Sequence, residues 1–458
     1  MSRLDPIVKA YDIRGTVPDQ LDDELSRALG IAFARFALDQ STDAQPVRQI
    51  LIGRDMRPSG VDLSAAFADG VRVQGLDVVH LGLVSTDLVY FAAGRLASPG
   101  VMFTASHNPA QYNGLKVCLA GAKPVGLESG LDVVKVIATA VLDGHGPADA
   151  AVRGSERELD LLDEFADHVR SFVDVSSFLP LRVVADTANG MGGLVVPKVF
   201  EPLPFELEVM YGELDGTFPN HPADPIQPAN QRDLVGRVVS GAFDIGLAFD
   251  GDADRVFLVD ESGRGLSGST TTAMLAAGVL ARDRGATILH NLICSKAVPE
   301  VIIERGGIPV RTRVGHSYIK QVMAETGAAF GGEHSAHYYF RDNYRADSGI
   351  IAAMVVLEQL CAAGVPLSVL RKPFERYEAS GEINTAVDDP AAVIDHVARV
   401  YATATQDHLD GLTVDVGRWW FNLRPSNTEP LLRLNLEAST RMECDDRVAE
   451  VLALITSR

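Results

Sequence analysis

Three aspartates spaced two residues apart are the strongest candidates for metal ligands in this sequence. Asp250, Asp252 and Asp254 follow an apolar run in the segment FDIGLAFDGDADRVFLVD (243–260). Carboxylates this close repel one another unless a cation neutralises them, and their oxygens suit hard ions such as Mg²⁺. Arg255, the next residue, can offer planar donors to a phosphate. The segment therefore predicts a magnesium site next to a phosphate-binding group.

Two other interpretations of the aspartates are weaker. Asp250, Asp252, Asp254 and Glu261 match positions 1, 3, 5 and 12 of a calcium-binding EF-hand loop. Position 6 of that loop requires glycine but is Arg255 here, and the flanking residues predict strands rather than helices. An acidic surface turn also fits poorly, because the apolar flanks would bury the carboxylates.

A serine follows another predicted strand. The segment TASHNPAQYNGLK (104–116) places Ser106 on an exposed turn at the end of the strand predicted at 100–105, where open α/β sheets present reactive groups. A serine in this position can act as a nucleophile or carry a phosphate, and His107 and Lys116 can stabilise phosphoryl charge. An ordinary Asn-Pro turn with a capping serine remains an alternative on residue types alone.

Two polar loops contain groups suited to a sugar phosphate. In FGGEHSAHYYF (330–340), Glu333 and Ser335 can hydrogen-bond sugar hydroxyls, and His337 can transfer a proton near neutral pH. In LRPSNTEP (423–430), a guanidinium and several donors can hold a phosphate, from Arg424, Ser426, Asn427 and Thr428. Taken alone, each loop can equally be a polar turn.

Several basic residues beside turns are lesser candidates. Each is more often structural when considered singly: Arg14 in YDIRG, Arg54 and Arg57 in GRDMRPSG, Lys296 in CSK and His316 in VGHS.

The elements that must position these residues alternate between short β-branched runs and longer amphipathic stretches. Strands are predicted at 49–53, 77–82, 100–105, 182–186, 206–211, 244–249, 286–291, 309–314 and 328–334. Helices are predicted near 21–37, 60–74, 86–95, 268–283, 296–306, 316–326 and 347–361. This alternation favours three doubly wound α/β units. The tail differs and predicts an antiparallel α+β domain, with strands at 382–387, 412–416, 418–423 and 431–438 and helices near 390–404 and 441–457.

Composition narrows the function classes. The 458 residues carry a net charge of −20, which disfavours nucleic acid and anionic membranes as partners. No apolar run approaches the roughly 20 residues of a membrane span, and the N-terminus lacks a secretory pattern. The four cysteines form no CxxC pair, which favours a cytoplasmic protein without disulfides. An acidic chain that binds an anion must gather basic groups locally.

Together the segments resemble the α-D-phosphohexomutase superfamily, in its phosphomannomutase/phosphoglucomutase branch. TASHNP, DGDADR, GEHSAH and RPSNTEP are similar to its phosphoserine, magnesium, sugar and distal phosphate loops, in the family's order, and YDIRG precedes them. The resemblance covers essentially the whole chain. It implies three α/β domains with mixed sheets plus a smaller C-terminal α+β domain around a central cleft. The implied domains span 1–150, 151–258, 259–374 and 375–458, and each contributes one loop.

The resemblance also implies roles for the residues. Ser106 would hold the transferable phosphoryl group and, with the three aspartates, bind Mg²⁺. His107, Lys116, Arg255 and His337 would act in catalysis. The substrate would be bound by Arg14, Lys296, His316, Glu333, Ser335, Arg424, Ser426, Asn427 and Thr428.

The implied reaction interconverts mannose 6-phosphate and mannose 1-phosphate, and also the glucose phosphates, through phosphoserine and a hexose 1,6-bisphosphate. The general base stays open among Lys116, His316 and His337. A phosphoglucosamine mutase, a phosphatase and a noncatalytic relative are the alternatives. A cytoplasmic monomer or homodimer is expected.

The sugar loop departs from the family pattern at one position. Ala336 stands where the family usually has glycine. If that position requires a positive φ, the alanine strains the turn, and otherwise the extra methyl is harmless.

Overall fold

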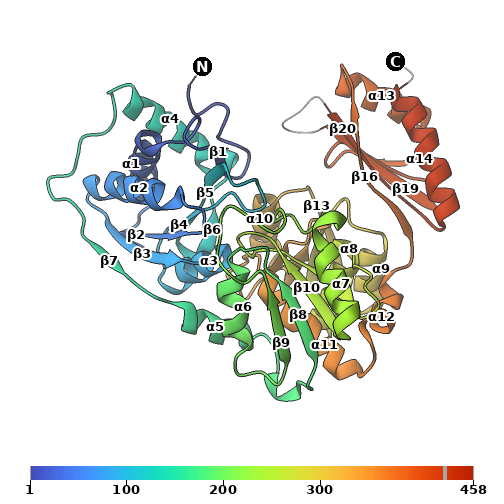
Figure 1. Cartoon of the computed structure of the whole chain (residues 1–458). Helices are drawn as coiled ribbons and strands as arrows, with labels where there is room; N and C mark the ends of the chain where they lie inside the picture. Colours follow the sequence, from blue (N-terminus) through green and yellow to red (C-terminus); the bar gives the residue numbers. More distant parts are fainter. Residues whose placement is uncertain (1, 426–430, 457–458) are drawn as a thin grey trace. The chain divides into compact units, whose positions relative to one another are not determined.

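The computed structural model describes residues 2–425 and 431–456, and the chain divides into two compact units. The larger unit comprises Met1–Leu266 and Ser335–Ser368, and the smaller comprises Ser267–His334 and Val369–Arg458. Both units contain sheets with helices packed against them (Figure 1). The predicted mixture of α/β sheets and a C-terminal α+β sheet is confirmed.

The first sheet of the larger unit has the strand order β1-β5-β4-β2-β3-β7, with β6 beside β5. The middle strands are parallel, whereas β1 and β5 run antiparallel to their neighbours. Its strands are β1 (Ile13–Thr16), β2 (Gln49–Arg54), β3 (Asp77–Leu83), β4 (Gly100–Phe103), β5 (Tyr112–Leu119), β6 (Lys123–Pro124) and β7 (Glu156–Glu158). Its helices are α1 (Asp23–Asp39), α2 (Gly60–Val73), α3 (Thr86–Arg95) and α4 (Leu131–Leu142), with short 3₁₀ turns η1 (Ala120–Ala122) and η2 (Leu127–Ser129).

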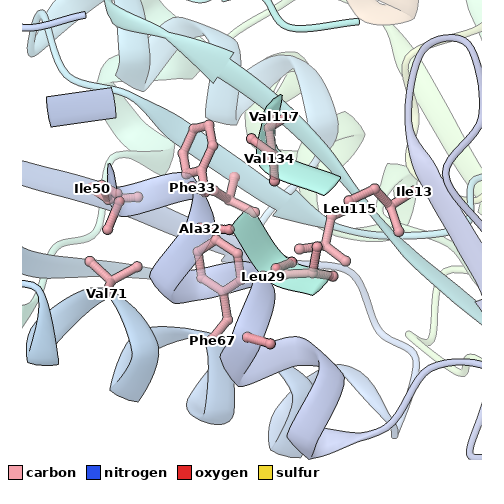
Figure 2. Packing of buried hydrophobic residues seen from close by; sticks show 14 of the residues in the cluster. Ile13, Leu29, Ala32, Phe33, Ile50, Phe67, Val71, Leu115, Val117 and Val134 are labelled. Atoms are coloured by element: carbon pink, nitrogen blue, oxygen red, sulfur yellow. The ribbon is translucent and has the colours of Figure 1, made fainter. Parts of the chain in front are cut away.

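Helices α1 and α2 pack unusually closely over this sheet. Helix α1 begins after Asp22, whose side chain accepts a hydrogen bond from the Leu25 amide at 2.9 Å. A Cβ atom on Gly30 would lie 2.2 Å from the Phe67 carbonyl oxygen, so only glycine permits this approach. The two helices bury an apolar cluster that includes Phe33 and Ile50 (Figure 2).

The second sheet of the larger unit has the order β11-β10-β8-β9. Strand β10 is parallel to β8 and antiparallel to β11, so residues 250–255 form the loop of a hairpin. All five residues of β10 are buried, as expected for an apolar central strand. The elements are β8 (Arg182–Asp186), β9 (Glu206–Met210), β10 (Ile245–Phe249), β11 (Val256–Asp260), α5 (Leu162–Arg170), η3 (Val175–Ser177), α6 (Gly192–Phe200), η4 (Pro228–Gln231) and α7 (Arg232–Gly241).

The remainder of the larger unit comes from a later part of the chain. It contains β15 (Tyr338–Phe340) and α11 (Gly349–Ala363), and α11 packs against β11. Helix α12 (Leu367–Leu370) and the 3₁₀ turn η5 (Lys372–Phe374) follow. Within the described residues, no single helix is long and apolar enough to cross a membrane, although α11 and the following Leu367–Phe374 segment meet that test together as a bent pair.

The smaller unit carries a parallel and an antiparallel sheet. Strands β13, β12 and β14 are parallel in that order, and the antiparallel sheet has the order β16-β20-β19-β18-β17. Helices α13 and α14 lie over one face of the antiparallel sheet and bury Leu432, Leu434 and Leu436 (Figure 1). The elements are α8 (Gly268–Arg282), β12 (Thr287–Asn291), α9 (Ala297–Glu304), β13 (Ile308–Thr312), α10 (His316–Thr326), β14 (Phe330–Gly332), β16 (Glu378–Ala386), α13 (Pro390–Val400), β17 (Thr405–Asp407), β18 (Leu412–Asp415), β19 (Trp419–Pro425), β20 (Leu431–Ala438) and α14 (Arg441–Thr456).

Candidate active site

Ser106 lies on a turn just after β4, as predicted, but the expected exposure is wrong, because the turn is strained and its serine is buried. Its φ is +50°, in the left-handed region that costs a residue with a side chain roughly 1–2 kcal/mol. The Ser106 amide donates to Thr104 Oγ1 at 2.9 Å, and the side chain is 4% exposed. Ser106 Oγ donates to Asp250 Oδ2 at 2.8 Å. The serine and the aspartate loop, 144 residues apart in sequence, therefore form one site.

The three aspartates are buried together in the loop between β10 and β11. Oxygens of Asp250, Asp252 and Asp254 lie within 4.8 Å of one another, and each residue is at most 1% exposed. Asp252 Oδ1 and Asp254 Oδ1 are buried and find no hydrogen-bond partner among the residues that the structure describes. Such oxygens are costly unless a cation or a donor meets them. The three carboxylates thus fit an oxygen-coordinated divalent ion such as Mg²⁺.

Two basic side chains partly balance the carboxylates. Lys116 Nζ donates to Asp252 Oδ2 at 2.7 Å and to Asp254 Oδ2 at 2.5 Å. Burial alone would lower the pKa of Lys116, but the charges of the two aspartates outweigh it and raise the pKa well above the usual value. Arg255 Nε donates to Asp250 Oδ2 at 2.9 Å. The two cationic side chains leave Asp252 Oδ1 and Asp254 Oδ1 without a donor among the described residues, which favours a further cation.

His107 is neutral beside the serine. Burial, together with the charges of Arg255 and Arg14, lowers the pKa of His107 well below its usual value. His107 Nδ1 lies 3.2 Å from Ser106 Oγ. When the hydroxyl proton of Ser106 is given to Asp250, an imidazole protonated at Nδ1 can act as the donor in this contact.

The turn is also held through Asn108. Arg14 Nη1 donates to Asn108 Oδ1 at 2.5 Å, while its Nη2 donates to Asp12 Oδ2 at 2.5 Å. The structure thus brings Arg14 to the serine turn, although its side chain contacts Asn108 rather than Ser106.

Sequence reasoning did not single out Thr86, which contacts the metal loop directly. Thr86 Oγ1 donates to Asp252 Oδ2 at 2.6 Å, and its amide donates to the Asp252 carbonyl oxygen at 3.1 Å. Thr86 is the first residue of α3, so the positive end of that helix lies at Asp252. The Ser-Thr-Asp run before an apolar stretch predicts a helix start, but nothing local relates it to residues more than 160 positions away.

Residues 335–337 of the predicted sugar loop lie beside the aspartates. His337 Nε2 is 3.7 Å from Asp254 Oδ1, and its Nδ1 is 3.1 Å from Ser335 Oγ. Ala336 is fully buried and has a φ of +67°. The strained alternative for this alanine is therefore the one that the structure adopts, and Ala253 in the metal loop has a similar φ of +62°.

We expect the strain at Ala336 to show in matched substitutions. Ala336→Gly gains roughly 1–2 kcal/mol of relieved strain but loses about 0.8 kcal/mol of methyl burial and up to about 1 kcal/mol of chain entropy. The free energy of unfolding should therefore change by less than about 1 kcal/mol. Ala336→Val should lower it by about 2 kcal/mol or more, because a β-branched residue tolerates positive φ poorly.

Chemical denaturation would measure both changes at Ala336. Ala138→Val, at a buried helical alanine, controls for crowding without strain. An equal loss in Ala336→Val and Ala138→Val would contradict the role of φ.

The remaining predicted residues lie in the smaller unit. Glu333 is 2% exposed and accepts from Asn291 Nδ2 at 3.3 Å. Lys296 Nζ donates to Asp415 Oδ1 at 2.7 Å, and Arg424 Nη2 donates to Glu382 Oε2 at 3.1 Å. Two sets of predicted groups lie outside what is described, namely the side chain of His316, which begins α10, and residues Ser426, Asn427 and Thr428.

These features define a class of protein with α/β sheets in which a loop at the end of a strand carries a buried carboxylate cluster hydrogen-bonded to a buried serine. Family models for phosphoglucomutase/phosphomannomutase match along the chain, with α/β/α domain I at residues 5–140, domain II at 163–263, domain III at 267–377 and the C-terminal domain at 382–454. The chain belongs to the phosphoglucomutase/phosphomannomutase family, which confirms the predicted resemblance.

Individual relatives agree with this assignment. A Xanthomonas campestris protein named phosphohexose mutases is 38% identical, over 94% of this chain and 95% of the relative. A phosphomannomutase from Salmonella montevideo is 36% identical over 98% of both chains. The solved structure of a phosphoglucomutase/phosphomannomutase family protein from Burkholderia thailandensis has a TM-score of 0.88 and 30% identity, covering 99% of this chain and 98% of that chain.

Proposed function

We propose that the chain is a phosphohexomutase that interconverts mannose 6-phosphate and mannose 1-phosphate, and also the glucose phosphates, through phosphorylated Ser106. The observation that carries the proposal is the 2.8 Å contact between Ser106 Oγ and Asp250 within the carboxylate cluster. The relatives named phosphomannomutase support the choice of hexose.

The proposed chemistry needs charge placed around a phosphoryl group at Ser106. Asp250, Asp252 and Asp254 would hold Mg²⁺, which when bound supplies positive charge to that group. Arg255 and Lys116 add cationic donors within the same cluster. Phosphoryl transfer depends mostly on such positioning and charge stabilisation.

Ser106 would give its phosphoryl group to the free hydroxyl of a hexose monophosphate. The resulting hexose 1,6-bisphosphate would turn and return its other phosphate to Ser106. Lys116 is held as an ammonium ion between two carboxylates, which suits charge stabilisation rather than proton removal. We therefore place the general base at His337 or His316.

The second phosphate and the sugar require further residues. We propose that Arg424, with Ser426, Asn427 and Thr428, holds the phosphate that is not reacting, while Glu333 and Ser335 read sugar hydroxyls and Lys296 contributes to binding. The proposed domains are 1–150, 151–258, 259–374 and 375–458, one loop from each. The central cleft, the cytoplasmic location and a monomeric or homodimeric state stay predictions.

Mutase turnover with Mg²⁺ and a trace of hexose 1,6-bisphosphate tests the proposal. We expect kcat/KM for mannose 1-phosphate and glucose 1-phosphate to agree within about tenfold, because the two sugars differ only at C2 and a small contact difference discriminates weakly. Ser106→Ala should show no turnover of either.

Other outcomes of that assay would contradict the proposal. A clear preference for glucosamine 1-phosphate would indicate a phosphoglucosamine mutase. Release of inorganic phosphate without isomerisation would indicate a phosphatase. No turnover by the wild-type chain would indicate a binding protein.

A further inference from the structure

Arg57 is a fully buried arginine that the proposed reaction leaves without a role. It lies in the turn between β2 and α2, and its side chain is 0% exposed. A buried guanidinium is costly unless every donor is satisfied. The contacts of the Arg57 side chain therefore indicate its role.

All five N–H groups of the Arg57 side chain are used, and four of them bind the backbone of the serine turn. Nη2 donates to the carbonyl oxygens of Ser106 at 2.9 Å and Asn108 at 2.7 Å. Nη1 donates to the carbonyl oxygens of Pro109 at 2.8 Å and Tyr112 at 2.9 Å. Nε donates to Asp55 Oδ2 at 3.2 Å. Only the planar five-donor fork of arginine can meet this set.

The guanidinium is also enclosed by the second sheet's loop. Arg57 Cζ lies 5.0 Å from the centre of the Phe218 ring, a distance typical of a cation–π contact. Nearby Gly216 approaches so closely that a Cβ atom there would lie 2.5 Å from Arg57 Cα. Arg57 is thereby fixed between the serine turn and the loop that contains Phe218.

The serine turn cannot fix its own geometry. Ser106 has a positive φ, which the surrounding structure must impose. Its carbonyl group lies between Arg57 and the metal loop, since a Cβ atom on Gly251 would come within 2.6 Å of the Ser106 oxygen. The backbone at Ser106 determines where Oγ lies relative to Asp250.

We propose that Arg57 is a positioning residue for phosphoryl transfer, which holds the backbone of residues 106–112 so that Ser106 Oγ stays at the carboxylate cluster. Arg57 touches neither substrate nor metal in this role and acts through Ser106. The inference rests on the proposed function. A displacement of about 1 Å in a reacting group can cost about 100-fold in rate.

Arg57→Lys is the direct test, because lysine keeps the charge but has three donors and no planar fork. We expect kcat to fall about 100-fold while KM changes by less than about threefold, since the sugar and distal phosphate contacts are untouched. Phe218→Leu keeps the arginine but removes the ring contact, and should lower kcat several-fold with KM unchanged. It also serves as the test should Arg57→Lys not fold.

A destabilised control separates positioning from general stability. Val71→Ala removes a methyl pair from the core under α2, away from the serine turn, and should lower the melting temperature with kcat unchanged well below it. Hydrogen exchange of unphosphorylated protein gives a readout that needs no activity. Amides of residues 104–114 should exchange faster in Arg57→Lys but not in Val71→Ala.

The outcomes distinguish the two proposals. An inactive wild-type chain would contradict the proposed function. Faster exchange confined to residues 104–114 in Arg57→Lys would still support the proposal that Arg57 holds this backbone in place. An active wild type with kcat and local exchange unchanged in Arg57→Lys and Phe218→Leu would overturn the positioning role. A kcat loss in Val71→Ala equal to that in Arg57→Lys would overturn it as well.

Discussion

Replacing Lys116 with methionine is expected to lower the free energy of unfolding of the metal-free protein by about 3–5 kcal/mol, because it leaves buried carboxylates without their partner. Lys116 bridges Asp252 Oδ2 and Asp254 Oδ2, and all three side chains are at most 9% exposed. Methionine preserves much of the length of the side chain, so the loss should be mainly electrostatic. Denaturation in the presence of a chelator would measure it.

Added Mg²⁺ should restore more stability to Lys116→Met than to the wild type. With the lysine gone, Arg255, which donates to Asp250, is the remaining cationic side chain hydrogen-bonded to the cluster among the described residues, so the cluster carries less positive charge. A ligand that binds only the folded state stabilises it by an amount that rises with the logarithm of its concentration relative to its Kd. The melting temperature of the variant should thus rise more steeply with Mg²⁺ concentration.

Lys123→Met, at an exposed lysine on β6, provides the matched control. It should change the unfolding free energy by less than about 0.5 kcal/mol. It should leave the response to Mg²⁺ unchanged. Equal effects of the two lysine variants would contradict a specific role for the Lys116 ion pairs. Turnover by Lys116→Met at wild-type rates would argue against its part in phosphoryl transfer.

The metal loop is the part of the site that local sequence could predict most fully. An apolar run of residues 245–249 must be buried, and the aspartates that follow it are carried to the end of that strand. The structure confirms strands on both sides, β10 and β11, which excludes the helical flanks of an EF-hand. Here the strand, the turn and the charges are all encoded within 16 residues.

The partner elements of the site depend on contacts that no local pattern encodes. Strand β5 carries Lys116 opposite Met102 of β4, yet its Asn113-Gly114 pair is typical of a turn. Gly114 is needed because the paired strand β1 lies so close that a Cβ atom on Gly114 would be 2.1 Å from the Ile13 carbonyl oxygen. Tertiary packing has overridden the local signal.

The burial of Arg57 is a second feature of the site that the local sequence does not predict. In the sequence it is one of two arginines in a basic turn, and solvent exposure would be the ordinary expectation for both. Its buried position follows only when residues 106–112 fold back over the turn with four inward-facing carbonyl groups. Thr86 reaches Asp252 by the same kind of long-range contact.

Asp87 beside Thr86 gives rise to the second prediction, an unusual dependence of stability on pH. The carboxyl group is fully buried and accepts hydrogen bonds from Ser348 Oγ at 2.6 Å and from Ser85 Oγ. Burial raises its pKa to about 7, with the charges of Asp254 and Asp347 adding to the effect against the two hydroxyl donors. The folded chain therefore keeps a proton that the unfolded chain, at a usual pKa near 3.8, has already lost.

This proton determines whether the stability rises or falls with pH. Between about pH 4 and pH 7 the folded state binds more protons at Asp87 than the unfolded state, so the contribution of Asp87 to stability falls as the pH rises and then levels off above 7. A difference of about three pKa units corresponds to a loss on the order of 4 kcal/mol over this window. Asp87→Asn removes the titrating group while keeping the shape, and both serine hydroxyls can reorient toward an amide.

The free energy of unfolding of Asp87→Asn should thus be close to that of the wild type at pH 4.5 and higher by up to about 4 kcal/mol at pH 8. The comparison is made in metal-free protein, so that bound Mg²⁺ does not alter the local charge. Denaturation midpoints at four pH values across this range would measure the divergence. The denaturation midpoint of Asp19→Asn, a substitution at an exposed turn, should follow that of the wild type at every pH. A constant difference between Asp87→Asn and the wild type across the range would mean that Asp87 does not titrate there, and that the energy of burying its charge is offset by the hydroxyl groups of Ser85 and Ser348.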